Sequence, residues 1–273
     1  MQSTKLLIGI LFFFQIQTQL HAQTISAFDA NVYHQISADL QGDDSFHYPD
    51  YYQVKEDPRL QNVNLLVLNH VESEFPYPNT PYNRKAQFGT WIKDRTDGTC
   101  MDTRGKVLVR DSKSTVTYRP NGCTVASGDW DDPYSGKRFD SASDIQIDHF
   151  VPLKSAYMTG GFEWDQKKRC LYANYMGNQF HLLSVSGREN LKKSDSSPSQ
   201  YMPSNRQYAC VYLKQWLEVK VIWGLRITPK EATAIQARVN DNQCDKTEFV
   251  VSSNFLKDQR RYMTDNADLC AGN

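Results

Sequence analysis

Apolar and polar positions alternate in two short stretches near the middle of the chain. In residues 144–148 every second residue is apolar, and residues 180–186 form a second short stretch that is largely apolar. A period of two is typical of a strand with one buried face. The pattern therefore predicts one strand over 144–148, which stops at Pro152, and a second strand over 180–186.

Several helices are predicted around these strands. Residues 164–174 predict a short helix, residues 189–194 are polar but rich in good helix formers and predict another, and residues 207–223 carry apolar side chains at helical intervals up to Gly224. Residues 228–231 (Thr-Pro-Lys-Glu) predict a helix start, because threonine caps, proline suits the first helical position and glutamate completes a capping box. The order near the middle is strand, long excursion, strand, helix.

Residues 82–140 favour short strands and turns. Residues 106–110 alternate weakly, residues 114–118 are rich in threonine and valine, and glycines and prolines separate such runs. With the helices that follow, this pattern predicts an α+β fold with short flanking strands and C-terminal helices.

The first 22 residues have the order of a secretory signal peptide. Lys5 precedes the nine apolar residues 6–14, and the small Ala22 stands at the expected cleavage point. Nine apolar residues are too few to span a bilayer, which needs about 20. We expect a mature protein that is soluble, not membrane-associated, and either periplasmic or secreted. Residues 23–80 show no motif and are interpreted as an N-terminal extension or linker.

The expected export determines how the six cysteines are interpreted. They are widely spaced and contain no Cys-x-x-Cys pair, so three disulfides are expected rather than a thiolate metal site. Six cysteines allow fifteen pairings, and the sequence does not choose between them. We favour Cys100–Cys123, Cys210–Cys244 and Cys170–Cys270.

Taken alone, the overall charge argues against a nucleic-acid partner. Lys plus Arg and Asp plus Glu are both 31, whereas nucleic-acid-binding domains are usually basic. The balance is uneven along the chain, however. Residues 149–193 hold seven basic and three acidic side chains, and residues 201–230 hold five and one. This distribution indicates modest, salt-sensitive binding of phosphates.

The adjacent pair Asp148-His149 carries the strongest candidate chemistry. A carboxylate is a hard metal ligand, and an imidazole titrates near working pH; hydrolysis of a phosphodiester needs a cation and a base of these kinds. Asn190 offers a second hard oxygen. Positive charge for phosphate is expected from Arg188, Lys192, Lys193 and Lys154.

These residues resemble the motifs of the HNH, or ββα-metal, nucleases, most closely the secreted branch of the domain also found in GmrSD-type restriction enzymes. The resemblance spans residues 82 to 244. Its motifs are Asp148 to Leu153, Tyr172-Ala173-Asn174, His181 to Ser186, Asn190 through Lys193 to Asp195, and Tyr201-Met202-Pro203.

The resemblance implies a role for each matched residue. His149 would be the general base, and Asp148 and Asn190 would bind the metal, with Mg²⁺ expected first and Mn²⁺, Zn²⁺ or Ni²⁺ as alternatives. His181 stands where the family has asparagine, and would steady the hairpin by hydrogen bonds or become a further ligand. Adjacent strand residues face opposite ways, so Asp148 and His149 must lie at the strand's end.

Several other residues have two interpretations. Asp102, Arg104, Arg110 and Asp111 would either contact phosphate or pin strands together as ion pairs, and the second is favoured. Residues 167–169 (Lys-Lys-Arg) indicate a solvated helix face, with phosphate binding as the alternative. Trp216 and Trp223 lie at helical spacing and indicate core packing.

The resulting hypothesis is an exported, metal-dependent endonuclease of low sequence specificity that cleaves DNA or also RNA. Its nuclease domain would cover residues 81–246, and residues 247–273 would form a C-terminal extension. Two alternatives stay open: a nuclease toxin with a protein inhibitor or immunity partner, and a non-catalytic, disulfide-stapled nucleic-acid-binding protein.

Overall fold

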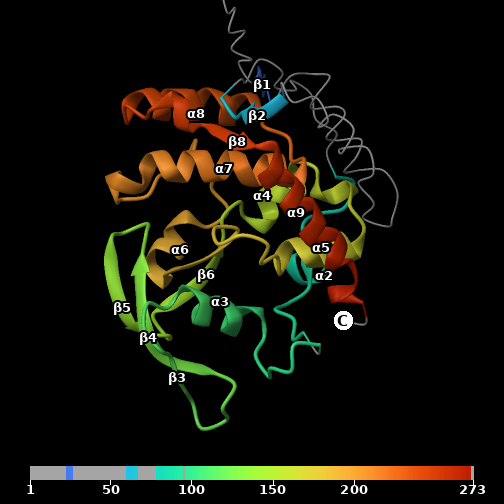
Figure 1. Cartoon of the computed structure of the whole chain (residues 1–273), viewed down its shortest axis with the longest axis vertical. Coiled ribbons are helices and arrows are strands. Elements are labelled where there is room, and N and C mark those ends of the chain that lie inside the picture. Colours follow the sequence, from blue (N-terminus) through green and yellow to red (C-terminus); the bar gives the residue numbers. More distant parts are fainter. Residues whose placement is uncertain (1–22, 27–59, 67–77, 95, 272–273) are drawn as a thin grey trace, which may run out of the picture.

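The computed structural model describes residues 23–26, 60–66, 78–94 and 96–271. The predicted signal peptide and most of the predicted N-terminal extension lie outside these residues. The described part combines helices with small sheets, as Figure 1 shows, so the α+β prediction is confirmed. None of the helices in this part is both long and apolar enough to cross a membrane.

A two-stranded unit lies at the centre. Strand β6 (Ile145–His149) pairs antiparallel with β7 (Leu182–Ser186), so that His149 faces Leu182, and α6 (Gly187–Lys193) follows β7 directly. The side chain of Ser186 caps α6 by accepting from the amide of Glu189. The excursion between the strands carries α4 (Leu153–Met158), η2 (Gly161–Glu163) and α5 (Gln166–Ala173). The predicted order of strand, excursion, strand and helix is confirmed; its assignment as an HNH core stays a prediction.

The region before β6 contains one prediction that is wrong. Residues 106–110 were expected to form a strand but belong to helix α3 (Thr103–Asp111). The side chain of Asp102 caps α3 by accepting from the Gly105 amide, and the buried residues lie at helical spacing. The short strands predicted nearby are present. The other elements are α2 (Arg84–Phe88) and the antiparallel strands β3 (Thr117–Tyr118), β4 (Val125–Asp132) and β5 (Lys137–Ser141).

The C-terminal part is mainly helical, as predicted. Helix α7 (Ala209–Trp223) ends at Gly224, whose φ of 61° is left-handed, and α8 (Pro229–Asp241) starts with the predicted capping box. The predicted C-terminal extension continues as packed structure. Strand β8 (Val250–Ser252) joins a sheet with β2 (Leu60–Asn64) and β1 (Gln23–Ser26), and α9 (Ser253–Asp265) follows. Short 3₁₀ turns are η3 (Arg206–Tyr208), η4 (Lys246–Glu248) and η5 (Ala267–Cys270).

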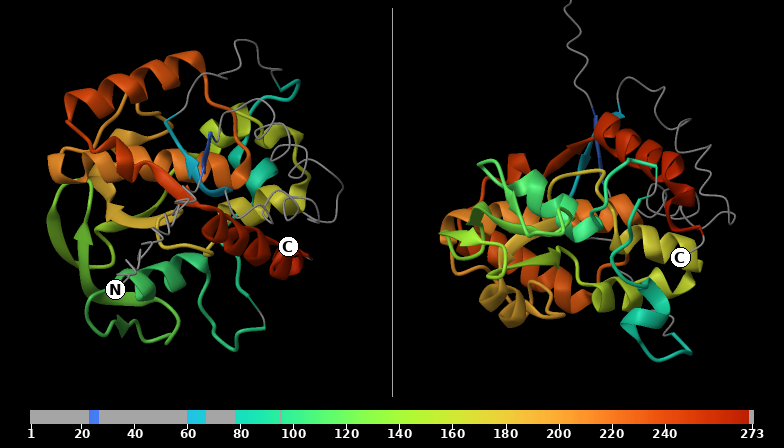
Figure 2. Two further views of the ribbon diagram at one scale, coloured as in Figure 1. Left: turned by 45° about the horizontal axis from the view of Figure 1, so that its top comes forward. Right: turned by 90° about the horizontal axis from the view of Figure 1, so that it is seen from below.

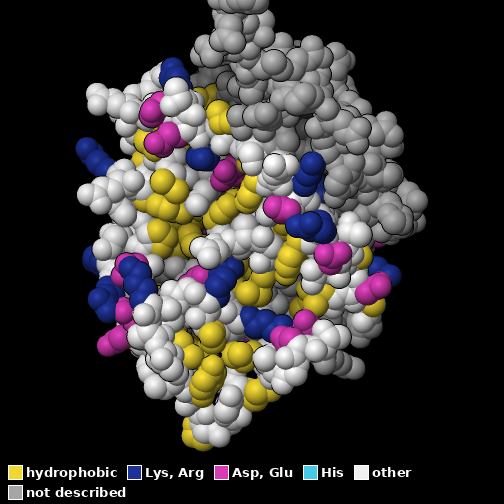
Figure 3. All heavy atoms as spheres, viewed as in Figure 1, with side chains coloured by type: hydrophobic (Ala, Val, Ile, Leu, Met, Phe, Trp, Pro, Cys, Tyr) yellow, Lys and Arg dark blue, Asp and Glu magenta, His cyan; other side chains and the backbone are white. Residues whose placement is uncertain are grey.

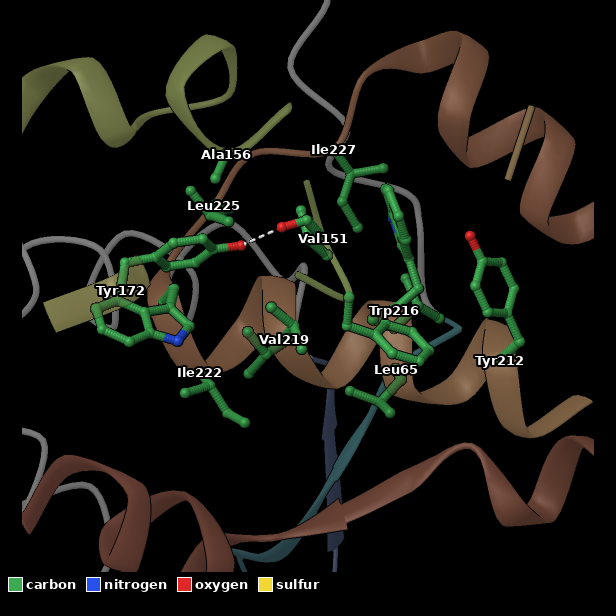
Figure 4. Packing of buried hydrophobic residues seen from close by; sticks show 14 of the residues in the cluster. Leu65, Val151, Ala156, Tyr172, Tyr212, Trp216, Val219, Ile222, Leu225 and Ile227 are labelled. Atoms are coloured by element: carbon green, nitrogen blue, oxygen red, sulfur yellow. Dashed lines mark hydrogen bonds between the residues drawn. The ribbon is translucent and has the colours of Figure 1, made fainter. Parts of the chain in front are cut away.

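The core surrounds α7. Trp216 and Trp223 are fully buried on this helix, which confirms their predicted packing role. Figure 4 shows the apolar side chains of α7 packed below Tyr172, whose hydroxyl donates to the carbonyl oxygen of Val151 at 2.6 Å. In Figures 1 and 2, α7 and α8 lie on one side of the β6–β7 unit and α3 with the β3–β5 sheet lies on the other.

Three disulfides link distant parts of the described chain. They are Cys100–Cys123, Cys170–Cys270 and Cys210–Cys244, so the favoured pairing is confirmed and no cysteine is free. The Cys170–Cys270 bond joins α5 to η5 across 100 residues of sequence. It therefore fixes the C-terminal end of the chain against the excursion between β6 and β7.

Candidate active site

His149 is the last residue of β6, and its imidazole is held from two sides. Its Nε2 lies 2.9 Å from the carbonyl oxygen of Ala173. Its ring stacks on the indole of Trp91, with planes parallel to within 2° and centroids 5.1 Å apart. Because a carbonyl oxygen only accepts hydrogen bonds, Nε2 carries the proton of the neutral ring and Nδ1 keeps its lone pair.

The environment of His149 keeps the ring neutral. Burial lowers the pKa of His149 to about 3, although the hydrogen bond to Ala173 acts in the opposite direction. His149 is buried, with 8% of its surface exposed. No hydrogen bond reaches Nδ1 from the described residues, so its lone pair is not engaged by them, which is what a general base requires.

Asp148 lies in a different environment. It is only 4% exposed, and the Lys193 ammonium lies 2.9 Å from each of its two oxygens. The hydroxyl of Tyr134 donates to Oδ2 of Asp148 at 2.7 Å, and Lys193 also donates to the carbonyl oxygen of His149 at 3.1 Å. Asp148 and His149 thus share no side-chain partner, as expected for neighbours on opposite faces at the end of a strand.

The Asp148–Lys193 contact is a buried ion pair. Burial raises the pKa of Asp148 and lowers that of Lys193, and the attraction between the two opposes both shifts. Burial next to the Asp148 carboxylate also raises the pKa of Tyr134, so its hydroxyl stays protonated and donates. One fixed cation therefore already neutralises Asp148.

Asn190 lies on the same side of the hairpin as Asp148. Its Nδ2 donates to Oε1 of Gln146 at 2.7 Å, and Gln146 is two residues before Asp148, on the same face of β6. No hydrogen bond reaches Oδ1 of Asn190 from the described residues. This amide is therefore oriented with its oxygen available as a ligand.

The donor chemistry of Asp148 and Asn190 fits a hard divalent cation. Both offer oxygen, and Oδ1 of Asp148 keeps one acceptor site beside its hydrogen bond from Lys193, whereas Oδ2 is contacted by both Tyr134 and Lys193. Within the described residues no group of three or more His, Cys, Asp or Glu side chains could hold a metal. An ion would therefore take its remaining ligands from water or phosphate, and would share Asp148 with Lys193 or displace it.

His181 supports the site from the interior. It is 1% exposed, and its Nε2 lies 2.8 Å from the carbonyl oxygen of Tyr172. Its ring meets those of Tyr172 and Tyr175 edge-on, and burial lowers its pKa to about 3. Its own carbonyl accepts from the Phe150 amide at 3.0 Å. Of its two interpretations, the geometry favours the one in which it steadies the hairpin.

The four residues predicted to contact nucleic acid lie in different surroundings. Arg188 and Lys192 are exposed and line a groove of about 650 Å³ at the start of α6. Lys154 is exposed and pairs with Asp195 at 2.6 Å. Lys193 needs a correction, because it is fully buried against Asp148 and presents no charge at the surface.

The arginines near α3 have the structural role that was favoured over phosphate contact, but they connect elements through backbone carbonyl oxygens and not through ion pairs between strands. Arg104 donates to the carbonyl oxygens of Ala142 and Ile145. Arg110 pairs with Asp111 at 2.6 Å, and Asp111 accepts from the amide of Ser184 in β7. The set therefore fixes α3 against β6 and β7.

Residues 167–169 are not uniformly solvated. Lys168 is buried over the ring of Trp164, and Arg169 donates to the carbonyl oxygen of Gln87. Lys167 alone is an exposed cation of this trio. The prediction of a solvated face is wrong for the other two, because α5 is packed on two sides.

Three contacts of the site could not be predicted from the motifs. Tyr134 lies in the turn after β4 and reaches Asp148, although a tyrosine in a turn gives no sign of this. Trp91 stacks on His149 from outside every chemical motif. Asn174 is part of the Tyr-Ala-Asn motif, and its side chain holds the backbone of Thr90 and Ile92 on either side of Trp91.

Comparison with known proteins places this site inside a matched region. The family described as "GmrSD restriction endonucleases, C-terminal domain" matches residues 102–238. An "Uncharacterized secreted protein" of Arthroderma benhamiae is 35% identical over 163 residues, which make up 60% of this chain and 76% of the relative. No solved structure matches the chain. The matched region contains β6, β7 and α6 and therefore His149, Asp148 and Asn190.

Proposed function

The chain belongs to the family of C-terminal domains of GmrSD restriction endonucleases, and from this we propose that it is an exported, divalent-metal-dependent endonuclease. Its substrate would be DNA, or also RNA, cleaved with low sequence specificity. Membership of this family supports a nuclease-related function for the chain in general terms. The observation that carries the proposal is His149, a neutral histidine with a fixed tautomer, whose Nδ1 accepts no hydrogen bond from the described residues.

His149 would act as the general base. Nδ1 would take a proton from a water molecule as the water oxygen forms a bond to the scissile phosphorus. The bond from phosphorus to the leaving sugar oxygen would break, and that oxygen would take up a proton from solvent water. The imidazolium formed would be stabilised through Nε2–H by the carbonyl oxygen of Ala173, which also keeps the ring oriented. Trp91 would hold the ring plane fixed during the transfer.

The substrate would be held by charge around α6. Arg188 and Lys192 line the groove at the start of this helix and would contact phosphates. A hard cation at Asp148 and Asn190, Mg²⁺ in the first place, would supply neutralisation of the charge that develops on the phosphate. Lys193 already balances the charge of Asp148, so the cation would have to share this carboxylate with Lys193 or displace it.

Export is supported by two observations. The matched relative is labelled secreted, and the described chain carries three disulfides, which persist in oxidising compartments. We therefore extend the proposal to a nuclease that works outside the cytoplasm.

A cleavage assay tests the proposal. The purified protein is incubated with plasmid DNA and with RNA, in Mg²⁺, in Mn²⁺ and in EDTA. We expect cleavage that needs a divalent ion, and a rate about 10²–10⁴-fold lower in His149→Ala, the usual contribution of a general base. His149→Ala must keep the wild-type melting temperature, which separates loss of the base from unfolding.

Each outcome has a distinct meaning. If no divalent ion supports cleavage, the nuclease proposal is wrong. A non-catalytic nucleic-acid-binding protein would then be favoured, because Lys193 already occupies the carboxylate of Asp148. Full cleavage by His149→Ala would overturn only the assignment of the base. Full cleavage in EDTA would overturn only the proposed dependence on a divalent metal.

A further inference from the structure

A groove beside His149 is not used by the reaction described above. It has a volume of about 700 Å³ and lies between the end of α2, residues 89–94 and the start of α5. Trp91, Lys85, Lys93 and Lys167 line it, together with the Cys170–Cys270 disulfide. Because Trp91 also stacks on His149, the groove adjoins the candidate base.

Trp91 is held rigidly in this groove. The side-chain amide of Asn174 donates to the carbonyl oxygen of Thr90 at 3.3 Å and accepts from the amide of Ile92 at 3.1 Å. The backbone is thus fixed on both sides of Trp91. Trp91 is partly exposed, whereas the other four tryptophans are buried. The protein therefore presents one preformed indole at this surface.

The charge of the groove is positive. Neither Lys85 nor Lys93 forms an ion pair with another described residue, and Lys167 lies 3.7 Å from Asp268 in an exposed pair, which is weak in water. The acidic side chain in the lining is Asp94, which lies 3.7 Å from Lys106. Three lysines against one aspartate leave a net charge of +2.

This combination suits an unpaired nucleic-acid strand. Lysines follow the phosphates, and an exposed aromatic ring stacks on a base of any type, which gives affinity without sequence preference. The faces of paired bases inside a duplex are covered by their neighbours, so an indole held in a fixed loop reaches an unpaired base more readily.

We propose that this groove binds a single-stranded segment of DNA or RNA. One base stacks on Trp91, and the flanking phosphates contact Lys85 and Lys93. The bound strand is thereby placed next to His149. This inference rests on the proposed nuclease function and adds to it the form of the substrate.

Binding measured without cleavage tests the inference. The full chain in EDTA is titrated into a labelled single-stranded oligonucleotide and followed by fluorescence anisotropy. We expect Trp91→Ala to weaken binding about tenfold, the loss typical of one stacked base, and Trp91→Phe to retain most of the affinity. The oligonucleotide should also protect tryptophan emission from acrylamide, since Trp91 is the partly exposed tryptophan.

The lysines provide an independent measurement. Lys85→Gln together with Lys93→Gln should reduce the slope of log affinity against log salt by about 1.4, because each phosphate contact of a single strand contributes about 0.7. The matched control is Lys230→Gln with Lys246→Gln, which removes two exposed lysines outside the groove. The control should leave the slope unchanged.

Affinity and salt slope that stay at wild-type values in the Trp91 and lysine variants would overturn the inference. Its failure is distinct from failure of the nuclease proposal. If binding depends on Trp91 but no cleavage is seen, the nuclease proposal is wrong and the binding groove stands. If cleavage depends on His149 but binding does not depend on Trp91 or the lysines, the nuclease proposal stands and the binding groove is wrong.

Discussion

At the residue scale, the site is governed by what each polar group is bonded to. His149 and His181 both lose most of their basicity through burial, yet they differ in access. Nδ1 of His181 is sealed and has no hydrogen-bond partner among the described residues, whereas Nδ1 of His149 is not one of such sealed atoms and belongs to a residue that is 8% exposed. The same side chain is therefore a structural support at one position and a candidate base at the other.

Lys193 leads to the first prediction at this scale. It is the charge that balances the buried Asp148, so Lys193→Met leaves an unpaired carboxylate in the interior. We expect a loss of about 3–5 kcal/mol in the free energy of unfolding, measured by urea denaturation. Adding Asp148→Asn to this variant should recover much of the loss. A single variant as stable as the wild type would contradict the ion pair.

The same variant tests whether Asp148 can take a metal. If a divalent ion competes with the Lys193 ammonium, Mn²⁺ should raise the melting temperature of Lys193→Met more than that of the wild type. The double variant with Asp148→Asn serves as the control and should show little response. Equal shifts in all three proteins would remove Asp148 from the ligand set.

The limits of sequence prediction are clear for these residues. Asp148, His149 and Asn190 could be found because short motifs mark them. The ion pair of Lys193 with Asp148 could not be predicted. A lysine in a basic run has the sequence pattern of a surface charge, and only the fold brings the carboxylate into contact with it. The role of Trp91 could not be predicted either, because no local sequence pattern connects it to His149, which lies 58 positions later.

At the element scale, the end of α5 organises the site. Three consecutive residues each hold one part of it: the carbonyl of Tyr172 binds His181, the carbonyl of Ala173 binds His149, and the side chain of Asn174 holds the loop of Trp91. The last turn of a helix leaves carbonyls without intrahelical partners, so it can serve such a purpose. The short Tyr-Ala-Asn motif is thereby explained by its hydrogen bonds.

Prediction of whole elements succeeded where the end signals were strong. The capping box at Thr228 and the terminal Gly224 define their helices from sequence alone. Helix α3 was missed because valines at 107 and 109 imitate a weak strand alternation. Its real determinant is the cap at Asp102 together with burial against β4 and β7, which depends on tertiary contacts.

Glu218 on α7 yields a pH-dependent prediction. Burial raises the pKa of Glu218 from 4.5 to about 7, although Lys214 at 3.9 Å opposes the shift. A carboxyl with a raised pKa in the folded protein costs nothing below pH 4.5. The cost grows as pH rises from 4.5 to 7, because the unfolded chain releases this proton while the folded protein keeps it, and it levels off at about 3 kcal/mol above pH 7.

We therefore expect Glu218→Gln to gain stability relative to the wild type at pH 8 and almost none at pH 4.5, as measured by urea denaturation at each pH. The exposed Glu248→Gln is the control and should shift neither value. The same gain at both pH values would show that ionisation of Glu218 is not the cause.

At the scale of the whole molecule, net charge is a poor guide to the surface. Both basic regions counted in the sequence include lysines that the fold buries: Lys168 and Lys193 in the first, Lys220 in the second. Lys193 and Lys220 are balanced by buried carboxylates. On the face in Figure 3, basic and acidic side chains alternate rather than forming one patch. Recognition of phosphate then depends on local grooves, such as those of Lys192 and Lys93.

The disulfides connect the stability of the whole chain to this local order. Ile92 packs against both Cys170 and Cys270, so this bond supports the loop that carries Trp91. The bond also anchors α5, whose end holds His149. Cys210–Cys244 instead ties α7 to the end of α8. The two bonds should therefore differ in function although both constrain the unfolded chain.

Paired cysteine-to-serine variants separate the two effects. Loop-closure entropy predicts a loss of about 4.7 kcal/mol for removal of Cys170–Cys270 and about 3.8 kcal/mol for Cys210–Cys244, since they close loops of 100 and 34 residues. Under conditions where both variants remain folded by circular dichroism, only the first should raise acrylamide quenching of tryptophan and lower the cleavage rate. Those two measurements report the Trp91 loop and the orientation of His149. If both variants changed them equally, general loosening of the fold would be the cause, and α5 would not be the element that carries the site.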